Sequence, residues 1–247
     1  MPDPRPGLPR EPKRLSSNAL VRFSERSTAL WHFYRVAERL LELYASAHGT
    51  RRRTKGADWL LDRLEDVELG WGVRTGRADL RARFQLLFDL WTMRYVDYFN
   101  MFLAELFLEV AEKRPQVLAS EERIEVSLLF ESTSLDEVKG LIAARRAISL
   151  SFGGFRETLK FFRERLNVRP ELDSNDLRRV HELIAIRNLI VHHDGVITDR
   201  FLLDTKWPVT RRGKRIVISE DLLDRQYEST ERVASELASA AMKKFSI

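Results

Sequence analysis

The sequence predicts a mainly all-α protein, a helical bundle with a small β-hairpin near its C-terminus. Apolar residues recur every three or four positions along most of the chain, which is the period of an amphipathic helix. Helical segments do not alternate with strands, and Ser151-Phe-Gly-Gly154 matches neither nucleotide-binding glycine pattern. A Rossmann or P-loop fold is therefore not expected.

Composition narrows the class of protein further. Hydrophobic residues make up 44% of the 247 positions, enough to bury a substantial core. The absence of cysteine excludes disulfides, thiolate catalysis and thiolate-bound metals, and it fits a cytoplasmic protein. The net charge of +5 is compatible with a polyanionic partner or with an ordinary solvated surface. Charged residues interrupt the most apolar segment, 84–110, so no membrane span is expected.

The first 21 residues differ from the rest of the chain. They are rich in Pro, Arg and Lys and lack apolar periodicity, which predicts a disordered basic tail at 1–21. They also lack the apolar run of a secretory signal. Residues 22–247 are expected to form a single helical domain.

The N-terminal half predicts two amphipathic helices before the central one. The first covers residues 27–48 and ends at Gly49, and the second covers 58–69. Between them lies a basic loop that either contacts phosphates or is an ordinary solvated connection; its arginines are Arg51, Arg52 and Arg53.

Residues 77–113 form the longest periodic segment and carry an aromatic stripe. We expect this helix to be the central one of the bundle, with the stripe in the core, although such a stripe can also line a cofactor pocket. No cofactor is expected. The stripe consists of Phe84, Phe88, Trp91, Tyr95, Phe99, Phe102, Leu106 and Val110.

The middle of the chain predicts further helices separated by recognisable stop signals. Residues 121–131 alternate like a short strand. Ser134 and Glu137 form a capping box that opens the next helix, and Ser151–Gly154 ends it. Another helix covers 155–166.

The helix expected at about 174–193 is apolar on nearly every side, which predicts burial. Asp173-Ser174-Asn175 caps its start, and Gly195 ends it. Beyond it, segments 207–209 and 215–218 flank a basic turn, which predicts the hairpin. Arg211 and Arg212 in that turn are candidate phosphate contacts, and Ser219 caps the last helix.

The helix at 174–193 carries the chemistry. A guanidinium in an apolar helix is costly unless an anion meets it, which singles out Arg187, with Asn188 beside it and His192 further on. Arg187 and His192 are separated by about 140° around a helix axis and about 7.5 Å along it. They therefore converge on one site only if this helix end opens into a groove. Alternatively, Arg187 and Asn188 bond helix-end carbonyls, and His192 and His193 simply complement the helix dipole.

The pattern Arg187-Asn188-Leu-Ile-Val-His192, followed by Asp194-Gly195-Val196, resembles the signature of the HEPN superfamily of helical ribonuclease and nucleotide-binding domains. The close resemblance covers residues 176–203, within a motif-bearing part at about 134–247. It implies a HEPN-like bundle acting as a homodimer. It also implies metal-independent RNA cleavage, in which a 2′-hydroxyl attacks the adjacent phosphate.

In that reaction Arg187 binds the phosphate, His192 transfers protons and Asn188 orients a neighbouring group. Glu182, His181 and His193 are candidate supporting residues. No metal site is expected, because no HExxH motif or second His pair occurs. The resemblance implies RNA as partner and a role as a toxin or antiviral-defence effector, with an antitoxin or other protein partner.

Two other functions remain open from the sequence. One is a non-catalytic module, in which Arg187 binds an RNA, a nucleotide or a partner's carboxylate. The other is a helical nucleic-acid-binding protein that uses the basic loops at 51–55 and 211–215.

Overall fold

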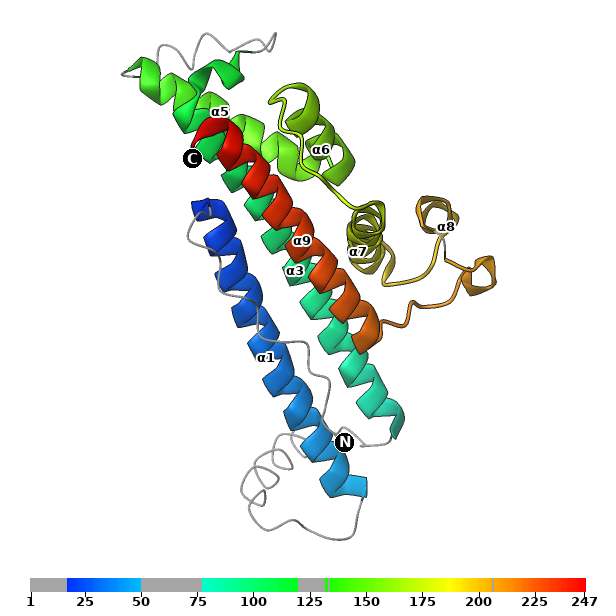
Figure 1. The fold of residues 1–247 in the computed structure, drawn as a ribbon. Helices are drawn as coiled ribbons and strands as arrows, with labels where there is room; N and C mark the ends of the chain where they lie inside the picture. The colour runs from blue at the N-terminus through cyan, green and yellow to red at the C-terminus, as the bar shows by residue number, and fades with distance from the viewer. Residues whose placement is uncertain (1–16, 50–76, 120–131, 133, 206) are drawn as a thin grey trace.

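The computed structural model describes residues 17–49, 77–119, 132, 134–205 and 207–247. Two long antiparallel helices, α1 (Asn18–Gly49) and α3 (Arg77–Lys113), run side by side along the molecule (Figure 1). The C-terminal helix α9 (Glu220–Phe245) packs on both of them and runs in the direction of α3. The other elements are η1 (Pro115–Leu118), α5 (Leu135–Phe152), α6 (Phe155–Glu164), α7 (Ser174–His193), α8 (Asp199–Asp204) and η2 (Val209–Arg211).

The aromatic stripe of α3 forms the core, as the sequence predicts. From Trp91 to Val110, every stripe residue is at most 2% exposed. Phe23 of α1 lies among them, with its ring centroid 5.3 Å from that of Phe102 and 5.9 Å from that of Tyr95. Tilted ring contacts of this kind add to the free energy of burial, so aromatic packing helps to hold α1 against α3.

The first helix begins earlier than the sequence predicts. Residues 1–16 of the expected tail lie outside the described residues, but α1 already starts at Asn18, and Ala19 is fully buried. Two arginines in the first turns of α1 pair with a carboxylate of α3: Arg22 Nε and Arg26 Nη1 each donate to Glu105 over 2.8 Å. The predicted end of the disordered tail at residue 21 is therefore wrong. The sequence could not reveal this, because the contacts that order residues 18–21 are made with α3, which is distant along the chain.

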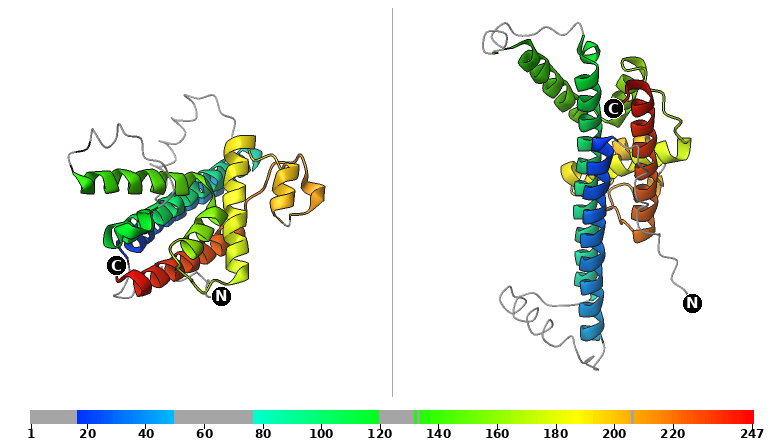
Figure 2. Two further views of the ribbon diagram at one scale, coloured as in Figure 1. Left: turned by 90° about the horizontal axis from the view of Figure 1, so that it is seen from above. Right: turned by 60° about the vertical axis from the view of Figure 1, so that its left-hand side comes forward.

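Helix α7 crosses the α3–α9 pair (Figure 2) and is buried on one face only. Val180, Leu183, Ile186 and Leu189 form that face. The predicted burial on nearly every side is wrong, because α7 lies at the edge of the bundle, where Asn188 and the residues around His192 are exposed. The predicted caps are confirmed: Asp173 accepts from the backbone of Asn175 and Asp176, and Ser134 accepts from Glu137.

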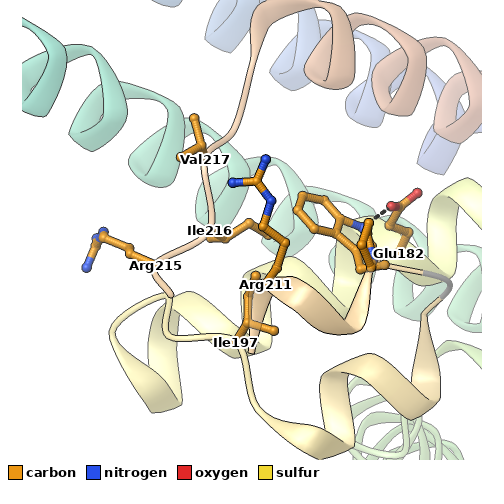
Figure 3. Close-up of a pocket in the computed structure, with 8 residues that line it drawn as sticks. Glu182, Ile197, Arg211, Arg215, Ile216 and Val217 are labelled. Atoms are coloured by element: carbon orange, nitrogen blue, oxygen red, sulfur yellow. Dashed lines mark hydrogen bonds between the residues drawn. The ribbon is translucent and has the colours of Figure 1, made fainter. Parts of the chain in front are cut away.

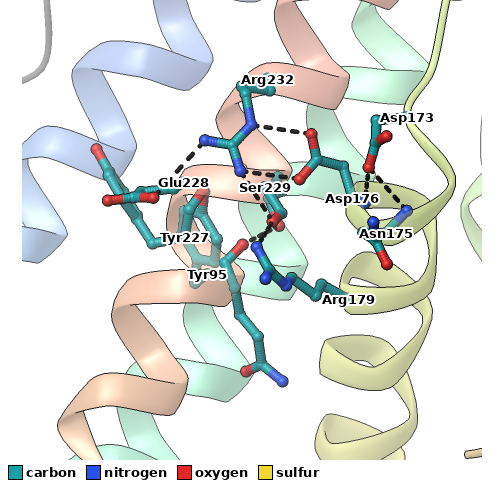
Figure 4. Close-up of polar contacts among 11 residues, drawn as sticks. Tyr95, Asp173, Asn175, Asp176, Arg179, Tyr227, Glu228, Ser229 and Arg232 are labelled. Atoms are coloured by element: carbon teal, nitrogen blue, oxygen red, sulfur yellow. Dashed lines mark hydrogen bonds and ion pairs between the residues drawn. The ribbon is translucent and has the colours of Figure 1, made fainter.

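Polar contacts fix the start of α7 against α9 (Figure 4). Arg232 donates to both carboxylate oxygens of Asp176, over 2.8 and 2.9 Å. This bidentate contact lowers the pKa of Asp176. Ser229 of α9 lies between Arg232 and Arg179 and accepts from both of them.

The predicted β-hairpin is absent from residues 207–218. Val209–Arg211 is a 3₁₀ turn, and Arg215 instead forms an isolated antiparallel bridge with Val196. Pro208 offers no backbone donor for a ladder, whereas Ile197 and Ile216 are buried on the segments that do pair. The helix at 58–69 and the strand at 121–131 lie outside the described residues.

A carboxylate joins the three long helices. Glu231 of α9 accepts hydrogen bonds from Ser27 of α1 over 2.9 Å and from Tyr95 of α3 over 3.2 Å. Burial raises the pKa of Glu231 to about 7, from an ordinary value of 4.5. The folded state therefore binds a proton that the unfolded chain releases, and stability falls as pH rises from about 4.5 through about 7.

We expect Glu231→Gln to be more stable than the wild type at pH 8, by about 2 kcal/mol, and nearly equal to it at pH 5. The neutral amide keeps an acceptor for Ser27 and Tyr95 but carries no buried charge. Urea denaturation at both pH values measures the difference. Glu236→Gln, at an exposed position of α9, is the control. A stability difference for Glu231→Gln that does not change with pH would contradict the prediction.

Candidate functional site

A hollow of about 540 Å³ opens beside the C-terminal half of α7. We call it the α7 hollow. It gathers four residues that the sequence singles out or places beside the motif: Arg187, Asn188, His192 and His193. The remaining lining includes Val96 and Asn100 of α3, Gly154, Phe155, Ile184, Ala185, Leu189, Thr198, Arg200, Phe201 and Asp204. The structure thus brings Arg187 and His192 to one opening, although they point in different directions from the helix axis.

Arg187 is oriented by two acceptors. Its Nη2 donates to Asp97 of α3 over 3.1 Å, and its Nη1 donates to Asn188 Oδ1 over 3.3 Å. The guanidinium carries more N–H donors than these two contacts use. The side chain is 27% exposed, so part of it remains accessible for an anion in the hollow. Asp97 could not be found from the sequence, because only the packing of α3 on α7 places it there.

The histidines lie at the end of α7, and this end is fixed to α3. His192 and His193 are exposed; the backbone then turns left-handed at Asp194, with φ 49°, and at Gly195, with φ 73°. Arg215 donates to the carbonyl and the carboxylate of Asp194 and, over 2.8 Å, to Asp89 of α3. Because Asp194 directly follows His193, these contacts fix the backbone that carries the two exposed histidines relative to α3.

The α7 hollow contains two arginines, and each is paired with a carboxylate. Arg187 pairs with Asp97 over 3.1 Å, and Arg200 lies 3.8 Å from Asp204, which also lines the hollow. A guanidinium with donors to spare can bind a phosphate group, and an imidazole can accept or donate a proton. The arrangement can therefore bind a phosphodiester and act on it by acid–base chemistry.

The other predicted site residues lie elsewhere. Glu182 and Arg211 line a second hollow, of about 410 Å³, where Glu182 accepts from the Trp207 indole N–H (Figure 3). His181 packs on Phe155, and burial lowers its pKa, with a further contribution from the charge of Arg156. Phe155 lines the α7 hollow, so His181 contacts a lining residue without lining the hollow itself.

The basic-loop residues are divided as well. Arg212 is exposed and pairs with Asp199 over 2.7 Å. Arg215 is engaged by α3 and by the end of α7. Arg51, Arg52 and Arg53 lie outside the described residues. Among the described residues, Arg211 lines the second hollow and pairs with no carboxylate, whereas Arg215, which lines the same hollow, pairs with Asp89 and Asp194.

Two general features concern metals and membranes. Across the described ranges, no three His, Asp or Glu side chains cluster in a way that could hold a metal ion. None of the described helices combines the length and apolarity needed to cross a bilayer.

Comparison of the chain with protein-family models, with curated proteins and with solved structures finds no match. The fold and site define a helical bundle with a hollow lined by two arginines and two histidines.

We expect Arg215→Ala to lower the free energy of unfolding by about 2 kcal/mol, because it leaves Asp89, 2% exposed, as a buried carboxylate without its cation. The value is below that of a fully buried pair because Arg215 is itself 44% exposed. Chemical denaturation measures the change. Arg212→Ala is the matched control, since an exposed ion pair contributes less than about 1 kcal/mol. Equal effects of the two variants would contradict a stabilising role for the contact between Arg215 and Asp89.

Proposed function

We propose that this protein is a metal-independent endoribonuclease that acts as a homodimer, with Arg187, Asn188 and His192 in its active site. The observation that carries the proposal is that Arg187 and His192 line the same open hollow. Further support comes from the resemblance of the Arg-Asn-three-residues-His pattern to the HEPN superfamily and from the mainly helical fold.

In the proposed reaction, His192 removes the proton from a ribose 2′-hydroxyl. The 2′-oxygen then attacks the adjacent phosphorus, and the bond from phosphorus to the 5′-oxygen breaks. Arg187 stabilises the additional negative charge on the phosphate oxygens. The leaving 5′-oxygen takes up a proton, so the products are a 2′,3′-cyclic phosphate and a 5′-hydroxyl.

A homodimer supplies the second proton-transfer group. One His192 accepts a proton while the His192 of a second copy donates one, which a single exposed imidazole cannot do in the same step. Exposed apolar side chains beside the hollow support a protein contact at this edge. Val191, next to His192, is 46% exposed, and Leu203 of α8 is 87% exposed.

The biological setting is a proposal by family analogy. HEPN-like ribonucleases act as toxins or antiviral-defence effectors, so a cognate antitoxin or other protein partner is expected. The lack of cysteine fits action in the cytoplasm, where RNA is the substrate.

A second candidate is a non-catalytic HEPN-like module that binds RNA, a nucleotide or a protein partner. The ion pair between Arg187 and Asp97 favours it, because this contact neutralises part of the charge that would stabilise a transition state. The two candidates differ in strand scission and in whether it depends on His192.

Cleavage of end-labelled mixed RNA in EDTA tests the proposal. We expect the wild type to leave 2′,3′-cyclic phosphate ends, and His192→Ala to cleave at least about a hundredfold more slowly, the usual scale of a lost acid–base group. His32→Ala, at an exposed position of α1, should cleave like the wild type. Equal cleavage by His192→Ala would rule out this site, whereas bound but uncut RNA would favour the non-catalytic module.

A second variant tests the role of Arg187. Arg187→Lys keeps the charge but loses the planar fork that contacts two phosphate oxygens, so we expect cleavage to fall about tenfold or more. Arg163→Lys, at an exposed position of α6 outside both hollows, is the control. Single-turnover rates at saturating protein separate the chemical step from binding. An unchanged rate for Arg187→Lys would exclude the bidentate contact.

A further inference from the structure

We propose that the second hollow binds one nucleotide, with its base against Trp207 and its phosphate on Arg211. We call it the Trp207 hollow. The nucleotide comes either from an RNA strand, in which case the inference rests on the proposed function, or from a free mononucleotide. Both share the same chemistry, a flat base linked through a ribose to a phosphate.

The size and apolar lining of the Trp207 hollow suit a base. Its volume of about 410 Å³ lies within the usual range for small-ligand sites, about 300 to 1,000 Å³. The apolar wall consists of the side chains Ile197, Trp207, Pro208, Ile216 and Val217. Val217 is 67% exposed, so an apolar surface is left uncovered at the mouth. Stacking of a base on an indole contributes to binding without selecting its sequence.

The indole is held in place before any ligand arrives. Trp207 donates its ring N–H to Glu182 of α7, and Phe201 of α8 meets it edge-on, with centroids 5.6 Å apart and planes at 66°. An aromatic ring fixed from two sides loses little conformational entropy on binding. The residues that orient Trp207 come from α7 and α8, which both also line the α7 hollow.

Charge in the Trp207 hollow is arranged for a phosphate. In the described part of the chain, Arg211 is exposed and has no carboxylate partner. Arg215 points away from the other labelled side chains in Figure 3 and pairs with Asp89 and Asp194. Arg211 is therefore the cation available to a ligand, and a guanidinium binds a phosphate through two parallel hydrogen bonds.

Glu182 adds selectivity among bases. Trp207 uses one carboxylate oxygen, Oε1, and the structure gives Oε2 no partner among the described residues. A carboxylate accepts hydrogen bonds from an exocyclic amino group, which adenine and cytosine carry where uracil has a carbonyl. The Trp207 hollow should therefore prefer adenine or cytosine to uracil. The same negative charge disfavours an acidic peptide as the occupant.

The two hollows lie within reach of one strand. Ile197 lines the Trp207 hollow, and the next residue, Thr198, lines the α7 hollow. Along α7, Glu182 and Arg187 are separated by an axial rise of about 7.5 Å. Even at the spacing of about 3.4 Å per nucleotide along one strand of duplex DNA, a few nucleotides cover this distance. A nucleotide held at Trp207 would place a neighbouring phosphate near Arg187 and His192.

Calorimetric binding of AMP, CMP and UMP, and of a 2′-O-methyl oligonucleotide of mixed sequence, tests the inference on the full chain. The methyl group blocks the attacking hydroxyl, so binding is measured without cleavage. We expect Arg211→Ala to weaken binding at least about tenfold, the usual loss for one charge-assisted contact. Arg212→Ala, the neighbouring arginine paired with Asp199, should change it less than about twofold.

Two further variants test the wall and the selectivity. Trp207→Leu should weaken binding, while Trp207→Phe, which keeps an aromatic face, should retain most of it. Glu182→Gln should reduce the preference for AMP and CMP over UMP. Thermal melts check that each variant is folded.

Arg211-dependent binding of the mononucleotides would support a free nucleotide as ligand, and Arg211-dependent binding of the oligonucleotide alone would support an RNA strand. Binding whose affinity is unchanged in Arg211→Ala, or no binding of any probe, would overturn the inference. These outcomes are independent of cleavage. If His192→Ala abolishes cleavage while Arg211→Ala leaves binding unchanged, the proposed function stands and the nucleotide site fails. If Arg211→Ala weakens binding while His192→Ala cleaves like the wild type, the nucleotide site stands and the proposed function fails.

Discussion

The structure depends on the burial of one aromatic face of α3. Between Trp91 and Phe102 that face is almost fully covered, by α1 on one side and by α9 on another. An α-helix of this length presents its apolar stripe to partners over many turns, so two long helices can pack on it along their length. Each other part of the described fold rests on this framework, either directly, as α5 and α7 do, or through α7, as α8 does.

The candidate site lies at the edge of this framework of long helices. Helix α7 buries one face on α3 and α9 and leaves the other open, so polar residues between its apolar positions reach the surface. Asp97 then holds Arg187 from α3, and Arg215 holds the turn after His193. The two motif residues share an opening because the helix ends there, and the chain that follows folds back beside it.

The two hollows adjoin where residues 195–197 pair with 213–216. Ile197 lines the Trp207 hollow, the next residue, Thr198, lines the α7 hollow, and Trp207 packs on Phe201 of α8. Ile197 and Ile216 are buried beneath that pairing. A few backbone hydrogen bonds and two apolar side chains thus position the groups of both hollows, which is why a short segment without regular strands has a defined form.

Local sequence signals were enough to predict several helix starts, the core face of α3 and the group of candidate site residues. Ser134, Asp173 and Ser219 cap their helices as expected, since a cap joins residues that are neighbours in the chain. The aromatic stripe of α3 identified the core, because its period is set by helix geometry alone. The motif on α7 pointed to Arg187, Asn188 and His192 as a group, whatever the rest of the chain does.

Only the tertiary structure decided the features that depend on contacts between distant segments. The start of α1 at Asn18 depends on Glu105 and Glu109, more than seventy positions later. The pairing of Arg215 with Val196, in place of a hairpin, depends on where Ile197 and Ile216 find a core. The partnership of Arg187 with Asp97 depends on the crossing of α7 over α3. Periodicity and capping are properties of a segment, whereas burial and ion pairing are properties of the assembled bundle.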